Sequence, residues 1–308
     1  MPTHKINCTF CGSSNTLLLY KHKYHPYITQ HGPIDFYKCK YCKSGFTYPL
    51  PTSTSLANLY ASFCDGLNPN TKKMRLESSF DKWFNQCINN ALNYSQKKYT
   101  SKDYFTWIDI GAGGGELSKL MSKKFPRSKG VAIDFHPRPK FLDDCKNLEW
   151  LQVDLNKKGF GSIFRSKFDL VFSITVIEHI LIPNVFISDC LSIMKNTGTF
   201  YITAPAFGSL ASRILKGRWS YLIFGEHINI PSKRGIILLM SQEANNKQFN
   251  KPIIFSRSII LPYPLVYYLK HFGLNNIANF FSEKICLSLP TGILEAGVCF
   301  KNEPLTSR

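Results

Sequence analysis

One short stretch limits what this chain can fold into. Residues 105–116 form an apolar run that ends at Asp109, then a cluster of four glycines, then the start of a helical pattern that reaches Phe125. A strand, a tight turn and a helix in immediate succession begin a βαβ unit. Glycines at such a turn adopt positive φ angles and let a ligand lie against bare backbone at a helix N-terminus. The stretch therefore predicts an α/β fold with a ligand-binding turn.

The glycine pattern differs from two common nucleotide-binding loops. Glu116 stands where the dinucleotide fingerprint has its third glycine, and no Gly-Lys-Ser/Thr step follows, as a phosphate loop would require. The pattern Asp-x-Gly-x-Gly-Gly-Gly resembles motif I of class I S-adenosylmethionine-dependent methyltransferases. This resemblance implies a doubly wound, mostly parallel sheet with S-adenosylmethionine as the cofactor.

The residues that follow alternate between strand and helix patterns. Strands are expected at 131–133, 148–153, 168–174 and 199–203, and a helix at 185–194. Acidic groups end successive strands, at Asp109, Asp134, Asp154 and Glu178–His179. Ligands of open parallel sheets bind at the carboxyl ends of the strands, so these side chains are predicted to surround one site.

The family resemblance implies roles for these positions. Residues that match cofactor-contacting positions are Asp109, Gly111, Gly113, Asp134, Asp154 and Leu155. Asp109 and the glycines would face the methionine part of the cofactor. Asp134 would accept hydrogen bonds from both ribose hydroxyls, and Asp154 with Leu155 would flank the adenine. Helix N-capping is the alternative for Asp134 and for Asp154.

Two histidines are candidates for the chemistry. Residues 176–180 resemble the Glu-His-Ile step of small-molecule methyltransferases, and the Glu226–His227 pair lies in what resembles the family's substrate loop. We predict His179 and His227 as candidate general bases, with Glu226 beside them, because histidine titrates near neutral pH. A merely structural role for either histidine stays open. Related sugar C-methyltransferases carry a tyrosine where this chain has Phe224, which weakens the case for C-methylation.

Two Cys-x2-Cys pairs near the N-terminus predict a metal site. Four thiolates from Cys8, Cys11, Cys39 and Cys42 suit a closed, structural tetrahedral zinc site. Strands are expected at 16–20 and 34–37, and His22, His25 and His31 are the alternative ligands between the pairs. The step at residues 46–51 resembles the N-terminal zinc ribbon of bacterial methyltransferases that often act on sugars in surface-polysaccharide pathways.

These patterns divide the chain into three parts. A zinc ribbon is predicted over 1–52, a helical linker and cover over 53–104, and the S-adenosylmethionine-binding domain over 105–308. An apolar helical face formed by Phe80, Trp83, Phe84, Cys87 and Ile88 should pack on that domain. Residues 252–290 read as an insertion or lid. A helix packed on the sheet is the favoured interpretation of this insertion, and a substrate lid or a surface-binding element is the alternative.

Charge and composition bear on the partner, the location and the type of methylation. The formal net charge is +18, which fits either an anionic partner or a lysine-rich composition without a function. No export signal or membrane-length apolar run is visible, so a cytoplasmic protein is expected. The ten cysteines are therefore expected to be reduced thiols or metal ligands rather than disulfides. The chain also lacks the Asp/Asn-Pro-Pro-aromatic and Pro-Cys steps of two nucleic-acid methylation chemistries.

The sequence thus predicts an S-adenosylmethionine-dependent methyltransferase of a small molecule, with a sugar or lipid-linked sugar as the favoured substrate. Methylation of RNA is the alternative enzyme activity, supported by the charge and the ribbon. A non-catalytic, ribbon-led binding protein is the third interpretation. Peripheral contact with a membrane is compatible with the basic charge.

Overall fold

A seven-stranded sheet forms the centre of the molecule. The computed structural model describes residues 5–23, 34–65, 77–165, 167–271, 274–282 and 285–300. The sheet has the order β10-β11-β8-β7-β4-β5-β6. Its strands are β4 (Thr106–Ile110), β5 (Lys129–Asp134), β6 (Leu148–Gln152), β7 (Phe168–Ile174), β8 (Met194–Pro205), β10 (Ile253–Pro264) and β11 (Cys286–Cys299).

The strand order places a switch point beside β4. Strands β4 to β8 pair in parallel, whereas β11 is antiparallel to both of its neighbours. The chain runs outward from β4 to β6 and then returns to β7 on the other side of β4. A crevice at the carboxyl ends of β4 and β7 is where doubly wound sheets bind ligands. The predicted doubly wound, mostly parallel sheet is confirmed.

The central strands are apolar because helices cover both of their faces. Every residue of β7 is buried, and in β4 the side chains alternate between two hydrophobic clusters on opposite faces. Trp107 fits only because its neighbour is glycine: a Cβ at Gly130 would lie 2.1 Å from the indole. The indole N–H donates to Ser128 Oγ at 2.8 Å, so its polar atom is satisfied inside the core.

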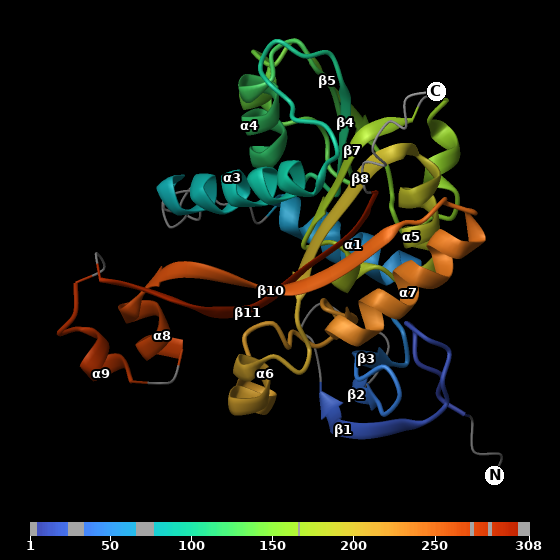
Figure 1. Cartoon of the computed structure of the whole chain (residues 1–308). Helices are drawn as coiled ribbons and strands as arrows, with labels where there is room; N and C mark the ends of the chain where they lie inside the picture. The colour runs from blue at the N-terminus through green and yellow to red at the C-terminus, as the bar shows by residue number, and fades with distance from the viewer. Residues whose placement is uncertain are drawn as a thin grey trace.

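Helices cover the two faces of the sheet (Figure 1). The helices α3 (Glu77–Tyr94) and α4 (Glu116–Lys124) pack on one face, and α5 (Pro183–Ser192) and α7 (Lys233–Asn246) on the other. Four residues of the predicted apolar face pack on the sheet: Cys87 and Ile88 are fully buried, and Trp83 and Phe84 are partly buried. The side chain of Phe80, the fifth, lies outside the described part of the structure. Ser232 caps α7, because its side chain accepts from the Gly235 N–H.

The N-terminal ribbon shares a sheet with the rest of the chain. Its strands β1 (Thr16–Lys23), β2 (Ile34–Cys39) and β3 (Gly45–Tyr48) are joined by β9 (Asn229–Ile230), in the order β1-β2-β3-β9. The helix α1 (Ser53–Asp65) follows, and its Leu56 and Leu59 pack with Ile228. The ribbon is therefore anchored to the main domain by hydrogen bonds as well as by apolar contact.

The segment between β10 and β11 forms an arm that projects from the body (Figure 1). The two strands pair antiparallel from Ile253↔Cys299 out to Pro264↔Cys286. The short helices α8 (Leu265–His271) and α9 (Asn275–Ala278) connect them at the far end. The segment is therefore a long hairpin with a helical tip, and the expected helix lying on the sheet is absent from its described residues.

In the part of the chain that the structure describes, no helix is both long enough and apolar enough to cross a membrane.

Candidate active site

The glycine turn lies at the switch point between β4 and β7. Gly111, Gly113 and Gly115 have φ angles of 73°, 55° and 82°, a region that favours glycine. A Cβ at Gly111 would lie 2.5 Å from Val176 Cγ2, just beyond β7, so backbone and side chain are in close contact there. A Cβ at Gly113 would meet nothing within 4 Å. The turn is thus closed toward β7 and open at Gly113, where a ligand can approach the backbone.

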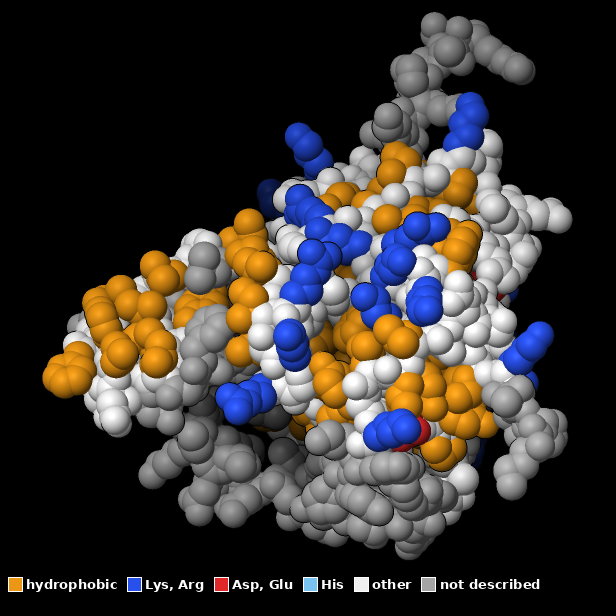
Figure 2. Space-filling view, turned by 90° about the horizontal axis from the view of Figure 1, so that it is seen from below, with side chains coloured by type: hydrophobic (Ala, Val, Ile, Leu, Met, Phe, Trp, Pro, Cys, Tyr) orange, Lys and Arg blue, Asp and Glu red, His pale blue; other side chains and the backbone are white. Residues whose placement is uncertain are grey.

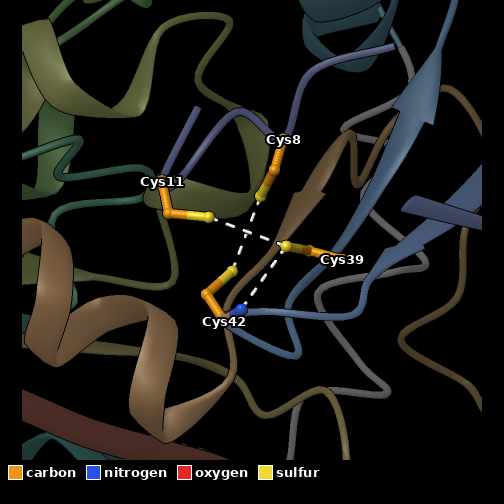
Figure 3. A group of neighbouring side chains, drawn as sticks. All are labelled: Cys8, Cys11, Cys39 and Cys42. Atoms are coloured by element: carbon orange, nitrogen blue, oxygen red, sulfur yellow. Dashed lines mark hydrogen bonds between the residues drawn. The ribbon is translucent and has the colours of Figure 1, made fainter. Parts of the chain in front are cut away.

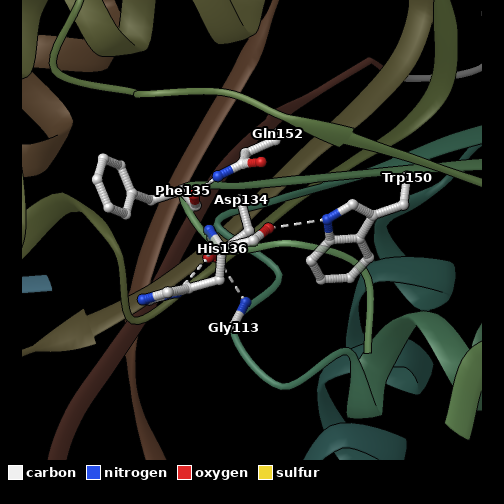
Figure 4. Close-up of polar contacts among 6 residues, drawn as sticks. All are labelled: Gly113, Asp134, Phe135, His136, Trp150 and Gln152. Atoms are coloured by element: carbon white, nitrogen blue, oxygen red, sulfur yellow. Dashed lines mark hydrogen bonds and ion pairs between the residues drawn. The ribbon is translucent and has the colours of Figure 1, made fainter. Parts of the chain in front are cut away.

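Asp134 joins the end of β5 to this turn (Figure 4). Its Oδ2 accepts from the Gly113 N–H at 2.7 Å, and its Oδ1 accepts from the His136 N–H at 2.9 Å. The ring Nδ1 of His136 lies 2.8 Å from the same Oδ1. Asp134 begins no helix, so its carboxylate is an acceptor for the ligand-binding turn rather than a helix cap. The sequence reasoning did not single out His136, although an Asp-x-His step at a strand end was a visible signal.

Asp109 is buried beneath the turn. It is 2 % exposed, and its Oδ2 accepts from Ser118 Oγ in α4 at 2.7 Å. Burial raises the pKa of Asp109 to about 7, and the nearby carboxylates of Asp134 and Glu116 add to the rise. This geometry makes Asp109 a brace between β4 and α4.

Asp154 and Leu155 follow β6 at the same edge of the sheet. Asp154 Oδ1 accepts from the Asn156 N–H at 3.0 Å, which shapes a local turn. Leu155 lines a shallow pocket with Ile180 and Phe186. An apolar side chain in this position can lie against a flat ring, as predicted for the adenine.

His179 and His227 come together from distant parts of the sequence. His179 ends the short 3-10 helix η4 (Ile177–His179), and His227 precedes β9. Their ring centroids are 4.8 Å apart. His179 Nδ1 lies 3.1 Å from the Glu226 carbonyl, and His227 Nδ1 lies 2.7 Å from the Tyr221 carbonyl. Because a carbonyl oxygen can only accept, each Nδ1 carries a proton, which leaves Nε2 as the acceptor atom of each neutral ring.

The electrostatics of the pair differ from the sequence-based expectation. Burial lowers the pKa of His179 to about 3, and neighbouring His227 contributes; burial alone lowers the pKa of His227 to about 4. The prediction that these histidines titrate near neutral pH is therefore wrong. The lowered pKa keeps both rings neutral near pH 7, so each Nε2 can accept a hydrogen bond, but each ring is a weaker base than an exposed imidazole.

Glu178 completes this cluster and was not predicted as a site residue. Its side chain is 1 % exposed, and its Oε2 has no hydrogen-bond partner among the residues that the structure describes. Burial raises the pKa of Glu178 to about 8, with a smaller contribution from Glu226. One ligand atom from each of Glu178, His179 and His227 lies within 4.8 Å of the others. Two imidazoles and a carboxylate can exchange protons with a substrate or hold a divalent cation.

The candidate residue Glu226 acts here through its backbone. Its carbonyl accepts from the His179 ring and so fixes that ring's orientation. Its carboxyl group is partly buried, and burial raises its pKa. Phe224, two residues earlier, packs edge-on against Tyr20 and Phe36 of the ribbon. The aromatic side chain at this position therefore belongs to the core.

The four predicted metal ligands converge in the ribbon (Figure 3). Cys8 Sγ lies 3.5 Å from Cys42 Sγ, and Cys11 Sγ lies 3.6 Å from Cys39 Sγ. Four sulfurs around a tetrahedral zinc with Zn–S bonds of about 2.3 Å would be roughly 3.8 Å apart. The cluster is therefore compatible with a small zinc site. All nine cysteines whose side chains the structure describes are free thiols.

A chain of backbone contacts connects the ribbon to the histidines. The Thr47 N–H in β3 donates to the Ile228 carbonyl at 2.9 Å. The Ile228 N–H in turn donates to the Glu178 carbonyl at 2.8 Å. Asn229 also accepts from Thr9 Oγ1 in the first Cys-x2-Cys turn. The position of His227 is thus fixed from one side by the ribbon and from the other by the loop after β7.

Comparison with known families identifies the domain. Residues 72–246, more than half of the chain, match the family model described as a methyltransferase domain. The chain belongs to this methyltransferase family. The match covers the glycine turn, Asp134 and both histidines.

Relatives of this methyltransferase-family protein are distant. A ubiquinone biosynthesis O-methyltransferase from Pasteurella multocida is 25 % identical over 129 residues, which is 38 % of this chain and 50 % of that protein. One from Xanthomonas campestris pv. campestris is 30 % identical over 112 residues, 34 % of this chain and 46 % of that protein. The matched region thus spans about half the length of these curated relatives.

Solved structures show the same fold. The plantazolicin methyltransferase BpumL in complex with SAH superposes with a TM-score of 0.51 at 14 % sequence identity. The superposition covers 80 % of this chain and 94 % of that one.

Proposed function

We propose that this protein transfers a methyl group from S-adenosylmethionine to a hydroxyl oxygen of a small molecule, with a sugar or lipid-linked sugar as the substrate class. The observation that carries the proposal is the convergence of two features at one end of the sheet. One is the glycine turn, open at Gly113 and tied to the carboxylate of Asp134. The other is the pair of neutral imidazoles just beyond β7. The O-methyltransferase names of the relatives support an oxygen acceptor.

The chain's residues have a limited task in this reaction. S-adenosylmethionine supplies a methyl group already activated on a sulfonium: the acceptor oxygen gains the O–C bond, and the electron pair of the broken S–C bond stays on sulfur. The protein must align the hydroxyl and accept its proton. We assign the acceptor role to Nε2 of His227, with His179 beside it. Burial of both rings excludes water from the hydroxyl.

We further propose that the ribbon holds one structural zinc ion through Cys8, Cys11, Cys39 and Cys42. All four candidate ligands are cysteines, so no coordination position is left open for a substrate. The sulfur spacing described above supports this assignment.

Methylation of RNA remains the second candidate because the chain carries a net charge of +18. An RNA-binding mode would lose affinity steeply with added salt, since released counterions drive it. A sugar substrate would show little salt dependence.

One experiment tests the function directly. The purified protein is incubated with methyl-labelled S-adenosylmethionine and separate aqueous, lipid and RNA fractions of cell extract, and labelled products are identified by mass spectrometry. We expect label on a carbohydrate-containing compound from the aqueous or lipid fraction. Label only on RNA would replace the proposal by the second candidate. No calorimetric binding of S-adenosylmethionine would refute methyl transfer altogether.

Replacing Asp134 by alanine should weaken S-adenosylmethionine binding by at least about tenfold. The substitution removes the acceptor proposed for the ribose hydroxyls, and hydrogen bonds to a charged group are worth about 1.5–3 kcal/mol. It also frees the Gly113 N–H that Asp134 now binds. Calorimetry measures the effect. The control is Glu149→Gln, which removes the charge of an exposed carboxylate on β6. Equal affinity in Asp134→Ala and wild type would refute the assignment.

A further inference from the structure

The outer part of the arm runs from residue 260 in β10, through α8 and α9, to residue 287 in β11, and it exposes seven large apolar side chains. Phe280 is 88 % exposed, and the others are between 39 % and 54 % exposed. The set is Ile260, Leu274, Ile277, Phe280, Phe281, Ile285 and Leu287. Single exposed apolar residues are ordinary, but a gathering of this kind on one projecting element marks an interaction site. Figure 2 shows hydrophobic side chains over much of the projecting arm on the viewed face.

The arm is also poor in charge. Between Arg257 and Glu295 the sequence has only three charged residues, namely Lys270, Glu283 and Lys284. An arm that extends into water would gain solubility from charged side chains, as the rest of this basic chain does. The low charge therefore favours an apolar environment around the tip.

A basic element lies beside the base of the arm. The helix α6 (Leu210–Leu215) and the 3-10 turn η5 (Lys216–Arg218) pack next to β11, where a Cβ at Gly292 would lie 3.5 Å from Ala211 Cβ. Leu210 and Ile214, one helical turn apart, are 63 % and 55 % exposed. The exposed cations of this element are Arg213, Lys216 and Arg218. Figure 2 shows Lys and Arg side chains spread over the body next to the apolar arm, on the same face.

We propose that the arm and α6–η5 together form a docking surface for an anionic lipid membrane. The apolar tip would enter the boundary between headgroups and acyl chains, while the cations of α6–η5 meet anionic headgroups. A lipid surface matches both halves of this face. RNA would match the cations and leave the tip in water, and a symmetric pairing of two copies through this face would place like charges together. The inference concerns exposed residues outside the catalytic cluster and stands without the proposed function.

Vesicle binding by the full chain tests the proposal. The protein is sedimented with vesicles of phosphatidylcholine alone and of phosphatidylcholine mixed with phosphatidylglycerol, in low salt. We expect tight binding to the anionic vesicles and weak binding to the neutral ones. The double variant Ile277→Ser/Phe280→Ser should bind anionic vesicles at least about tenfold more weakly, because two large apolar side chains are lost from the boundary. The affinity for anionic vesicles should fall about a hundredfold in the triple variant Arg213→Gln/Lys216→Gln/Arg218→Gln.

Matched controls separate the surface from general effects. Tyr104→Ser/Ile163→Ser removes two exposed apolar side chains elsewhere, and Lys97→Gln/Lys98→Gln/Lys123→Gln removes three exposed cations near α3 and on α4. The cation control leaves Lys82 unchanged, because Trp83 beside it packs against Ile259 and Ile293 at the base of the arm. Both controls should bind like wild type, and circular dichroism should show that all variants are folded. Equal binding of the arm variant and wild type would overturn the proposal, as would failure of wild type to bind anionic vesicles. A wild-type dimer in light scattering that Ile277→Ser/Phe280→Ser converts to a monomer would overturn it in favour of a second copy.

Discussion

Replacing Cys39 by serine should remove zinc from the protein and lower its melting temperature by about 10 °C or more. Structural zinc sites contribute much of the folding free energy of the element that holds them, and each kcal/mol corresponds to about 2–4 °C for a chain of this size or somewhat smaller. The effect should extend beyond the ribbon. The buried cysteines Cys8, Cys39 and Cys42 belong to the same hydrophobic cluster as residues of α5 and α7.

Elemental analysis and thermal unfolding measure this result. We expect one zinc per wild-type chain and none in Cys39→Ser. Cys286→Ser is the control, because it makes the same chemical change at an exposed cysteine outside the cluster. Wild-type protein purified without chelator and free of zinc would refute the metal assignment. If the Cys39→Ser variant has the same melting temperature as wild type, the ribbon does not contribute to the stability of the main domain.

Replacing His227 by alanine should reduce turnover a hundredfold or more while leaving the affinity for S-adenosylmethionine unchanged. Loss of a positioned proton acceptor typically costs this much. The ring of His227 packs against His179, whereas Asp134 and Gly113 form the contact assigned to the cofactor. His136→Ala provides the contrast, because its ring contacts Asp134 Oδ1 and its loss should weaken cofactor binding instead. Turnover and calorimetry on the two variants separate the roles. Normal turnover in His227→Ala would exclude it as the acceptor.

The pH profile gives a second readout of the same residue. Burial holds the pKa of His227 at about 4, so the neutral form needed to accept a proton is present above that value and lost only as the pH falls toward it. Wild-type turnover should therefore show no loss near pH 6.5 due to this ring. A loss centred near 6.5 that disappears in His227→Ala would indicate that the ring is exposed to water during turnover.

Much of the fold could be predicted because its signals are local. The apolar run of β7, the glycine turn after β4 and the Ser232 cap of α7 each depend on neighbouring residues. The acidic strand ends could be placed together because parallel strands bring their carboxyl ends to one edge. Asp134 and Gly113 are therefore in contact as the topology requires.

The rest depends on contacts that leave no local pattern. Strand β9 has two residues, and it forms only because β3, far away in the sequence, pairs with it. Burial of His179, His227 and Glu178 comes from several elements at once, so the direction of their pKa shifts could not be read from residue type. The arm was misjudged because an amphipathic pattern does not show whether its apolar face meets the sheet or the surroundings.

The pairing of β3 with β9 has a consequence for the modularity of this architecture. A ribbon that merely precedes an enzyme domain can be lost or exchanged in evolution without damage to its neighbour. Here the two parts share a sheet, so removal of residues 1–52 would leave the backbone groups of β9 that now pair with β3 without a partner strand, next to the histidines. We therefore expect the ribbon and the domain to behave as one structural unit, so that a substitution at the β3–β9 pair affects both.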